Sequence, residues 1–403
     1  MALKPRNLLL VGFDLAALAR SARAAGYEVL AADYFGDLDL AEACARYEAV
    51  VKQAPGRSCG RIKDRYDPEV FLKLARKLSE EAPVDGVLLS SGLDDFPNVL
   101  EGLEDVAPIL GNSPGAFARV RDKAKFFAEL KRLGLPHPET SVAEGFKEAK
   151  KAAKDIGYPV VLKPLSGFAG AGVRKAEGTS ELKVGFKAAA SPGGKVVVQE
   201  YIRGTHASIS FLSSGNEAKV LAASKQLLGL KELGQPEPFG FCGSVLPFNL
   251  AESERREEIA EKLTSRFGLK GSNGVDVVVS DGGDLYIIEV NPRFQATLEC
   301  LERVLNLNLV RLHVKACLSG FLPKAPSETG KYCARVILFA KGRARVSDLR
   351  ALSWARDIPI PGVIVEEGEP LCSIVAEGRT GGEALRRGME AARFVYRNLT
   401  APV

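Results

Sequence analysis

The stretch GVDVVVSDGGDLYIIEVNPRF, residues 274–294, decides the fold. It predicts two apolar strands joined by the turn SDGGD, whose glycines can adopt the positive φ that a tight hairpin needs. Each strand carries an acid, Asp276 in the first and Glu289 in the second. Side chains alternate along a strand, so Glu289 and Asn291 point to one face, and pairing through the turn brings Asp276 beside them.

Two neighbouring carboxylates on a buried hairpin need compensation. At about 4–5 Å they repel by roughly 3–4 kcal/mol when the effective dielectric is about 20, so the pair persists with a proton or a cation. Oxygen donors, including the Asn291 amide, suit Mg²⁺ or Mn²⁺ better than zinc. Arg293 adds a fork that binds anions, and a metal beside an arginine suits a phosphate substrate. The alternative is an edge hairpin whose acids are solvated.

The composition is that of an ordinary soluble globular protein. The chain has 403 residues, of which 46% are hydrophobic and 26% charged, and this length predicts roughly two to four domains. The net charge of +5 is small and the basic residues are dispersed, so nucleic acid is not expected as a partner. The apolar run near the N-terminus is too short for a signal or membrane segment, so no membrane partner is expected.

The cysteines form no recognisable metal or disulfide pattern. They are widely spread without a CxxC pair, and only three histidines accompany them, so no zinc site is predicted. Scattered free thiols fit a cytoplasmic location. The seven cysteines are Cys44, Cys59, Cys242, Cys300, Cys317, Cys333 and Cys372.

Residues 7–33 predict a strand, a helix and a second strand, as in a nucleotide-binding βαβ unit. The phosphate fingerprint G-x-G-x-x-G is missing, because Gly12 is followed by the letters FDL. We therefore expect a Rossmann-like scaffold without its own dinucleotide. Asp33, at the end of the second strand, is open to a structural or a functional role, and the loop 33–40 could face a substrate.

A second group of signals precedes the hairpin. Asp94 and Asp95 either contact a substrate amine or are solvated loop acids. The turn-forming stretch 111–117 marks a domain boundary, and a helix follows it. Lys123 lies near the start of this helix, where the helix dipole favours acids, so it either helps to hold a phosphate or has no special role.

Residues 158–173, YPVVLKPLSGFAGAGV, combine an apolar strand that carries Lys163 with a loop of small residues. A lysine inside an apolar strand is costly unless its charge is used, and a glycine-rich loop lets backbone N–H groups approach an anion. Together they predict a triphosphate clamp that is not a Walker loop, because GKS and GKT are absent. The alternative is a plain hairpin whose lysine reaches solvent.

The middle of the chain predicts an interrupted strand. Residues 196–212 start as a buried strand, pass through the linker QEYI and resume after Gly204. Such a linker leaves backbone donors and acceptors free, which is what an adenine edge requires. Lys225 belongs to the next strand, residues 298–320 predict a long amphipathic helix, and residues 331–403 predict short strands and a final helix.

These elements, in this order, resemble the ATP-grasp superfamily over roughly residues 110–320. The resemblance rests on Lys123, Lys163 with its glycine loop, the QEYI linker and the pattern D-x12-E-x-N-x-R. It implies an α/β and α+β architecture, in which an ATP-grasp fold lies between a Rossmann-like N-terminal domain and a small C-terminal α+β domain. The expected parts are residues 1–112 (Rossmann-like), 113–195 (small subdomain with a glycine-rich lid), 196–330 (large subdomain with the metal site) and 331–403 (C-terminal domain).

The resemblance also implies roles for individual residues. Lys123 and Lys163 would hold the α- and β-phosphates of ATP, and the backbones of Glu200 and Ile202 would read adenine. Arg293 resembles the arginine that stabilises the acyl-phosphate and its tetrahedral successor in biotin carboxylase and its relatives. The remaining implied ATP contacts are Ser166, Gly167, Gly170, Gly172, Gln199, Tyr201, His206 and Lys225, and the implied ligands of two Mg²⁺ ions, or Mn²⁺, are Asp276, Glu289 and Asn291.

One position departs from the family pattern. Many ATP-grasp members carry a glutamate that takes the ribose hydroxyls, and here His206 stands in its place. A neutral imidazole can accept one ribose hydrogen bond, so nucleotide binding would survive but weaken. Within the superfamily the chain resembles predicted ATP-dependent carboligases related to biotin carboxylase, an impression carried by the loop 33–40 and the segment 357–362.

The resemblance implies an ADP-forming carboxylate–amine ligase. A carboxylate would attack the γ-phosphate, and an amine, such as an amino acid or coenzyme precursor, would displace phosphate from the acyl-phosphate. Lys163 and Arg293 would be the catalytic residues, and a homodimer is possible. Arg293 also suits a second hypothesis, a carboxylase or carboligase that uses bicarbonate. His206 suits a third, a non-catalytic protein that binds ATP.

Overall fold

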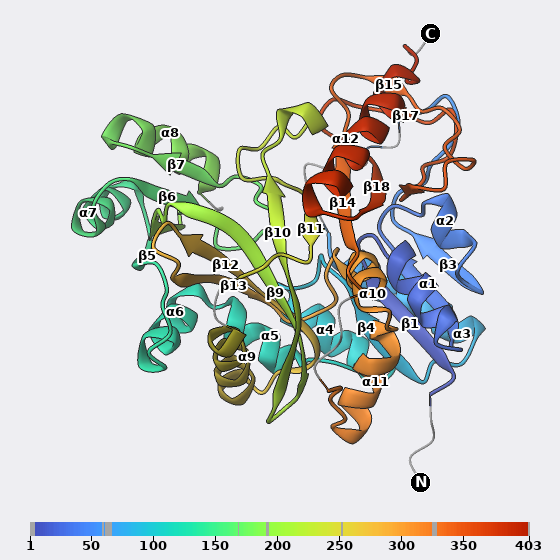
Figure 1. The fold of residues 1–403 in the computed structure, drawn as a ribbon, viewed down its shortest axis with the longest axis horizontal. Coiled ribbons are helices and arrows are strands. Elements are labelled where there is room, and N and C mark those ends of the chain that lie inside the picture. The colour runs from blue at the N-terminus through green and yellow to red at the C-terminus, as the bar shows by residue number, and fades with distance from the viewer. Residues whose placement is uncertain are drawn as a thin grey trace.

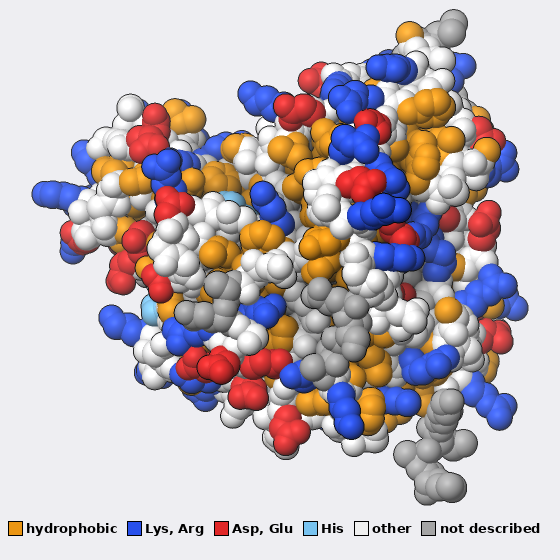
Figure 2. All heavy atoms as spheres, in the orientation of Figure 1, with side chains coloured by type: hydrophobic (Ala, Val, Ile, Leu, Met, Phe, Trp, Pro, Cys, Tyr) orange, Lys and Arg blue, Asp and Glu red, His pale blue; other side chains and the backbone are white. Residues whose placement is uncertain are grey.

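The structure is a computed structural model that describes residues 5–58, 60, 67–167, 169–190, 193–250, 253–324 and 329–401 (Figure 1). Cys59 lies outside the described residues, and the six cysteines within them are free thiols. No helix in the described part of the chain is long and apolar enough to cross a membrane. Acidic and basic side chains are interspersed over much of the face shown in Figure 2.

The first part of the chain forms a parallel sheet in the order β3-β2-β1-β4. The strands β1, β2 and β4 are buried along nearly their whole length and mostly apolar, as expected for a parallel sheet covered on both faces, whereas the edge strand β3 is largely exposed. Helices alternate with the strands, which confirms the Rossmann-like expectation. The strands are β1 (Asn7–Gly12), β2 (Glu28–Asp33), β3 (Arg46–Ala49) and β4 (Gly86–Leu89), and the helices are α1 (Ala16–Ala24), α2 (Leu38–Ala41), α3 (Glu69–Glu81) and α4 (Pro97–Glu104).

Asp33 is used by the backbone of this sheet. Its carboxylate accepts hydrogen bonds from the amides of Leu15 at 3.1 Å, Phe35 at 2.8 Å and Gly36 at 2.7 Å. Burial raises the pKa of Asp33 to about 7 against the lowering effect of these hydrogen bonds. Of the two roles left open for Asp33, the structure supports the structural one, because the carboxylate fixes the start of α1 and the turn after β2.

A small antiparallel sheet, in the order β5-β8-β6-β7, forms the next layer. Helices α7 and α8 cover it, and the loop between β6 and β7 is the glycine-rich stretch. Figure 1 shows this unit on the opposite side of the molecule from the N-terminal sheet. The elements are α5 (Pro114–Arg121), α6 (Lys123–Arg132), β5 (Thr140–Ala143), α7 (Phe146–Ile156), β6 (Val160–Lys163), β7 (Arg174–Ala176), α8 (Thr179–Ala189) and β8 (Val196–Glu200).

The largest layer is an eight-stranded antiparallel sheet in the order β13-β12-β9-β10-β11-β14-β18-β16. The predicted hairpin is its edge pair, and Gly283 has the expected positive φ of 92°. The elements are β9 (Gly204–Ser214), β10 (Ala218–Leu228), the 3₁₀ turn η1 (Lys231–Leu233), β11 (Phe241–Leu246), α9 (Ser253–Phe267), β12 (Lys270–Ser280), β13 (Leu285–Asn291), β14 (Tyr332–Phe339), β16 (Ala355–Arg356), β18 (Pro370–Gly378) and α12 (Gly381–Arg397). The short pair β15 (Ala344–Arg345) and β17 (Ile364–Val365) lies apart. Because the large sheet continues past residue 330, the four-part division of the chain stays a prediction.

The expectation of one long helix over 298–320 is wrong. Two helices form instead, α10 (Leu298–Leu305) and α11 (Leu309–Ser319). Asn306 ends α10 in the left-handed conformation, with a φ of 49°, and Asn308 caps α11 by accepting from the amide of Arg311 at 2.8 Å. Apolar periodicity does not register such a break, whereas asparagine tolerates left-handed φ and favours N-caps.

The N-terminal sheet and the large sheet share one apolar core. Side chains of β1 and α1 pack with those of α10 and α11 in a single buried cluster. His313 of α11 also joins the two parts, because its Nδ1 accepts from the Ser272 amide at 2.7 Å and its Nε2 contacts the Leu110 carbonyl at 2.7 Å. Burial lowers the pKa of His313 to about 4. A neutral histidine therefore fixes how the N-terminal sheet meets β12.

Candidate functional site

A cavity of about 320 Å³ lies between the small sheet and the large sheet. Its walls come from β6 and the glycine-rich loop on one side and from β9, β10, β12 and β13 on the other. Most of the residues predicted from the sequence line it. They are Lys123, Lys163, Ser166, Gly167, Gly170, Gln199, Glu200, Tyr201, Ile202, His206, Asp276, Glu289, Asn291 and Arg293.

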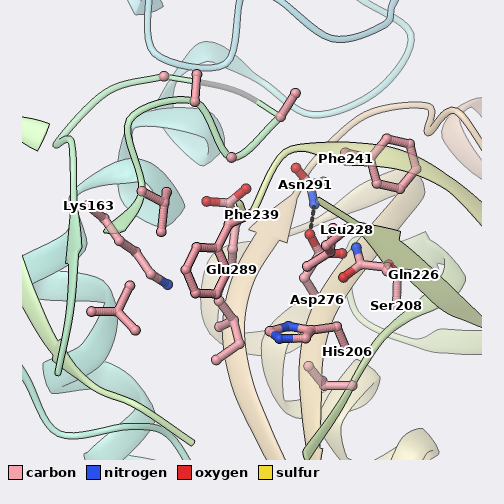
Figure 3. A pocket seen from close by; sticks show the side chains of 18 of the residues that line it. Lys163, His206, Ser208, Gln226, Leu228, Phe239, Phe241, Asp276, Glu289 and Asn291 are labelled. Atoms are coloured by element: carbon pink, nitrogen blue, oxygen red, sulfur yellow. Dashed lines mark hydrogen bonds between the residues drawn. The ribbon is translucent and has the colours of Figure 1, made fainter. Parts of the chain in front are cut away.

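The hairpin places its acids as the strand pattern indicates. Asp276 and Glu289 are cross-strand partners, and the register shifts directly after them. Asn291 donates from Nδ2 to the Asp276 carboxylate at 3.2 Å. Figure 3 shows these three side chains on the cavity side of the hairpin, with Lys163 reaching toward them from β6. One small region thus contains two carboxylates and an amide.

Lysine and arginine compensate the charge of Glu289. Lys123 donates to its Oε2 at 2.8 Å, and Arg121 lies 3.4 Å from the same oxygen. Burial alone would raise the pKa of Glu289, but Lys123 and Arg121 hold it well below its usual value. The cation expected beside the acid pair is thus supplied in part by the protein itself, through Arg121 of α5 and Lys123 of α6.

Asp276 makes no ion pair within 4 Å among the residues that the structure describes. Burial raises its pKa, and the neighbouring Glu289 carboxylate raises it further, against hydrogen bonds with Ser208 and Gln226 and the charge of Arg293, which lower it. Among the described residues no group of three or more His, Cys, Asp or Glu side chains is placed to hold a metal ion. Two carboxylates and the Asn291 amide still form an all-oxygen set, which fits Mg²⁺ when water and phosphate oxygens complete the shell.

Lys163 is the cation with the least compensation. Burial lowers its pKa to about 8, and the positive charge of Lys123 lowers it further, with Glu289 and Asp276 opposing. A buried ammonium next to another cation gains from an anionic ligand. The site thus combines carboxylates on the hairpin with an excess of positive charge on the side of β6.

Arg293 is oriented by two cavity side chains. Its Nε donates to the Asp94 carboxylate at 3.1 Å, and its Nη2 donates to Oδ1 of the Asn291 side-chain amide at 3.1 Å. Asp94 comes from the loop after β4, so the N-terminal sheet positions an arginine of the hairpin motif. Asp94 is therefore neither a solvated loop acid nor free for a substrate amine.

The glycine-rich loop is attached at both ends. The amide of Gly167 donates to Asp95 at 2.9 Å, and its carbonyl accepts from Arg121 at 3.1 Å. Asp95 in turn holds Arg121 at 2.9 Å. Asp95 and Arg121 therefore connect the loop to Glu289, the residue that Arg121 contacts on the hairpin.

At its far end the loop packs against residues 237–241. The Phe241 amide donates to the Ala169 carbonyl at 3.0 Å, and the Gly172 amide donates to Glu237 at 3.3 Å. A Cβ on Gly170 would lie 2.0 Å from the carbonyl oxygen of Phe239, so only glycine fits there. Gly172 itself does not line the cavity.

The QEYI linker forms one rim of the cavity. Tyr201 lies under the Lys175 ammonium, which is 4.1 Å from the ring centroid. The Glu200 side chain turns to the Glu139 amide at 3.1 Å, so its backbone and not its carboxylate faces the cavity edge. In the described structure the Ile202 amide has no hydrogen-bond acceptor, which leaves it available to a ligand.

His206 and Lys225 have different positions relative to the cavity. His206 lines it, and burial together with Lys163 lowers the pKa of its imidazole. Lys225 is exposed on the other face of β10, and its neighbour Gln226 lines the cavity instead. The residue of β10 that reaches the cavity is therefore Gln226 and not the expected Lys225, because neighbouring residues of a strand point to opposite faces.

Several residues of the site carry no motif of their own. Arg121 lies two residues before Lys123, and its helix places it against Glu289. Phe239 and Phe241 close the cavity beside His206, and no pattern in the sequence indicates them. The loop 33–40 does not line the cavity. It contacts the segment 357–362 instead, through the Leu38 amide and the Asp39 carboxylate.

Comparison with known proteins agrees with this geometry. The ATP-grasp domain family model matches residues 120–297. An uncharacterized protein of Methanocaldococcus jannaschii is 27% identical over 376 residues, which are 92% of this chain and 88% of the relative.

Solved structures resemble the chain over nearly its whole length. The biotin carboxylase domain of Hydrogenobacter thermophilus 2-oxoglutarate carboxylase, in complex with MgADP, ADP and bicarbonate, has a TM-score of 0.75 at 16% identity, covering 98% of this chain and 90% of that one. Campylobacter jejuni biotin carboxylase has a TM-score of 0.73 at 19% identity, covering 98% and 92%. The N5-carboxyaminoimidazole ribonucleotide synthetase PurK, in its ADP complex, has a TM-score of 0.69 at 16% identity, covering 98% and 97%. Residues 120–297 are therefore an ATP-grasp domain, and the chain as a whole has the fold of the biotin carboxylases and PurK.

Proposed function

We propose that the protein is an ATP-dependent ligase that activates a carboxylate as an acyl-phosphate, releases ADP and transfers the acyl group to an amine. Support comes from the cavity, which combines the hairpin oxygens with Lys123, Lys163 and Arg293 at a site with the ATP-grasp fold. Phosphoryl transfer of this kind needs positioned cations more than a covalent nucleophile.

ATP occupies the cavity between the two sheets in this proposal. Its adenine meets the backbone of Glu200 and Ile202, and its phosphates meet Lys123, Lys163 and the amides of the glycine-rich loop. Asp276, Glu289 and Asn291 hold Mg²⁺, which would shield the charge on the β- and γ-phosphates. The loop excludes water from the acyl-phosphate, which water would otherwise hydrolyse.

The position of Arg293 is the main observation in favour of the proposal. Its guanidinium is held between Asp94 and Asn291 at 3.1 Å each, two residues beyond a metal-ligand candidate. A fixed arginine beside the transferring phosphate suits an oxyanion that develops on an acyl carbon. Simple ATP binding would not require a cation in this place.

A bicarbonate-using carboxylase is the second candidate. One observation favours it, the likeness to a biotin carboxylase domain whose structure contains bicarbonate. The acids around Arg293 do not support it, because the carboxyphosphate formed from bicarbonate must lose its hydroxyl proton when it decomposes to CO₂. Asp94 is paired with Arg293, and Glu289 is paired with Lys123 and Arg121, so neither is free to serve as the base.

Trapping the intermediate tests the proposal. The protein is incubated with MgATP, a panel of carboxylates and saturating hydroxylamine, and ADP and hydroxamate are measured. We expect one class of carboxylate to give ADP and hydroxamate in equal amounts. AMP and pyrophosphate as products would reject the mechanism, and ADP release that depends on bicarbonate without any other carboxylate or amine would select the second candidate.

A further inference from the structure

A second, smaller chamber of about 30 Å³ lies at the carboxyl ends of β1 and β4. It shares Ser91, Gln295 and Ala296 with the large cavity, so it adjoins the segment directly after Arg293. In parallel α/β sheets this edge is the usual place for ligands. The space is enough for one small polar group.

Asp14 is the carboxylate of this chamber. It follows β1 with a φ of 57°, in the left-handed region that aspartate adopts more readily than most residues. One oxygen, Oδ2, pairs with Arg335, and the other, Oδ1, is buried without a hydrogen-bond donor among the described residues. The chain thus places a buried carboxylate oxygen here without a donor from the described residues.

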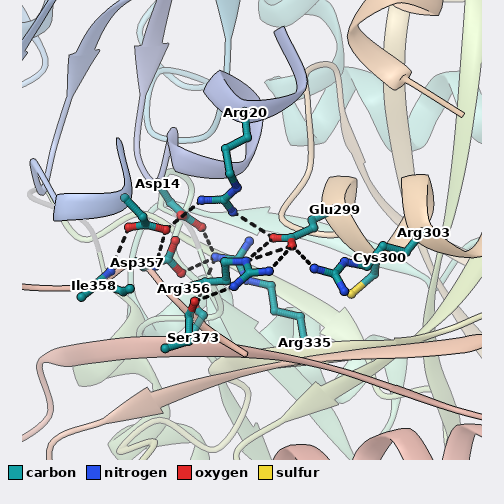
Figure 4. Close-up of polar contacts among 12 residues, drawn as sticks. Asp14, Arg20, Glu299, Cys300, Arg303, Arg335, Arg356, Asp357, Ile358 and Ser373 are labelled. Atoms are coloured by element: carbon teal, nitrogen blue, oxygen red, sulfur yellow. Dashed lines mark hydrogen bonds and ion pairs between the residues drawn. The ribbon is translucent and has the colours of Figure 1, made fainter. Parts of the chain in front are cut away.

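Among the described residues that line the chamber, Arg335 of β14 is the only cation, and two acids share it. Its Nη2 contacts Asp14 and also Asp357 at 2.6 Å, its Nη1 donates to the Ala296 carbonyl at 3.0 Å, and its Nε is buried without an acceptor. Its side chain is only 4% exposed. Figure 4 shows Asp14 and Asp357 converging on this guanidinium, with Glu299 and its arginines nearby.

Asp14 and Asp357 share one guanidinium and also hydrogen-bond with each other, so their charge is compensated when one of the two carboxyl groups carries a proton. Burial raises the pKa of Asp14 well above its usual value, and the adjacent Asp357 raises it further, with Arg335 opposing. A buried charge of this kind takes up a proton or a cationic ligand. In addition, Oδ1 of Asp14 can accept a hydrogen bond from a ligand.

We propose that this chamber receives the amino group of the acceptor substrate, with Asp14 as the acceptor of its N–H bonds. The proposal rests on the ligase function above and names the class of its second substrate, a primary amine. The buried Arg335 Nε, also without a partner, favours an amine that carries a nearby carbonyl or carboxylate oxygen, as in an amino acid.

Asp14 can also accept the proton that the substrate ammonium must lose before it attacks the acyl carbon. An entering ammonium replaces the proton that Asp14 holds in the free protein, and that proton leaves to solvent. The ammonium then gives one of its own protons to the Asp14 carboxylate and becomes the neutral nucleophile. Its attack on the acyl carbon forms the C–N bond, and the C–O bond to phosphate breaks with its electron pair on phosphate, which takes the second proton. The raised affinity of Asp14 for a proton suits this role.

Binding to the wild-type protein is the first test. With MgADP present, glycine is compared with glycolate and alanine with lactate by thermal shift and calorimetry, because each pair differs only in the amino group. We expect stabilisation and binding by the amines alone. Equal binding of the hydroxy acids would show that the chamber holds only a water molecule and would overturn the proposal.

The Asp14→Asn variant is the second test, and asparagine tolerates the positive φ. With the carboxylate found by hydroxamate trapping, we expect the KM for the amine to rise about 10- to 100-fold, the effect of losing a charged hydrogen bond, and hydroxamate formation to stay unchanged. An unchanged KM for the amine would reject the role of Asp14.

Glu377→Gln is the matched control. Glu377 pairs with Arg303 near the same group of charges but does not line the chamber, so this equal change in charge should leave the KM for the amine unchanged. If the wild type forms no hydroxamate with any carboxylate, the proposed ligase function is rejected. The comparison of glycine with glycolate still tests whether the chamber binds an amino group.

Discussion

Charged side chains around Glu289 face a cavity of about 320 Å³, whereas those around Arg335 fill the joint between the N-terminal sheet and the last strands of the large sheet. The first group, the cavity cluster, consists of Arg121, Lys123, Lys163, Asp276, Glu289 and Arg293. The second group, the joint cluster, consists of Asp14, Arg20, Glu299, Arg335, Arg356 and Asp357.

The two clusters differ in what their charges are available for. In the joint cluster Glu299 contacts Arg20, Arg303 and Arg356 at 2.7–2.9 Å, so its charge is compensated within the protein. Asp14, beside the small chamber, is the exception, because it shares Arg335 with Asp357. In the cavity cluster Lys163 and Asp276 lack close partners of opposite charge in the described structure. A high density of charge therefore does not by itself mark a ligand site, whereas incomplete compensation beside a cavity does.

Removal of Arg335 should give the largest change in stability. Arg335→Ala leaves Asp14 and Asp357 as uncompensated buried charges, and we expect the free energy of unfolding to fall by about 3–5 kcal/mol. Urea denaturation at neutral pH measures this.

Arg350→Ala is the control for Arg335→Ala, because Arg350 pairs with Asp348 at 2.6 Å on the surface, with side chains 60% and 47% exposed. Exposed pairs contribute little, so this variant should stay within about 0.5 kcal/mol of wild type. Equal losses in the two variants would show that the joint cluster does not hold the N-terminal sheet in place.

The two clusters also differ in how far the sequence predicts them. Asp276, Glu289, Asn291 and Arg293 lie within one hairpin, where alternation along the strand sets which side chains meet. Asp14 and Arg335 are 321 positions apart, and no local pattern connects them. Lys225 and the helix 298–320 show the limit even within local patterns, because a shift of one residue along β10 or one left-handed asparagine changes the outcome.

Removal of Glu289 should affect turnover and not the fold. Glu289→Gln takes away one candidate metal ligand and the partner of Lys123, so we expect turnover to fall at least about 100-fold. Circular dichroism should stay close to wild type, because the cavity gives water access to the cations that are left behind.

Glu257→Gln is the matched control for Glu289→Gln. The Glu257 side chain is 30% exposed and pairs with Lys219, while that of Glu289 is 32% exposed, and Glu257 lies outside the cavity. It should keep wild-type turnover. Wild-type activity in Glu289→Gln would mean that the hairpin does not bind the metal.

The pH dependence of nucleotide binding should show the smallest effect and should belong to the cavity cluster alone. Lys163 has a pKa of about 8 in the free protein, and a bound phosphate would raise it. Its contribution to ATP affinity is therefore complete below pH 8 and is lost as the pH rises, by about tenfold between pH 7 and pH 9. Calorimetric titration at several pH values measures this loss.

The ATP affinity of Lys163→Arg should not change between pH 7 and pH 9, since a guanidinium stays protonated. Lys225→Arg is the control and should keep the pH dependence of the wild type, because Lys225 lies outside the cavity. If the ATP affinity of Lys163→Arg still fell between pH 7 and pH 9, the titrating group would not be Lys163. The cavity cluster would then not differ from the joint cluster in the way proposed.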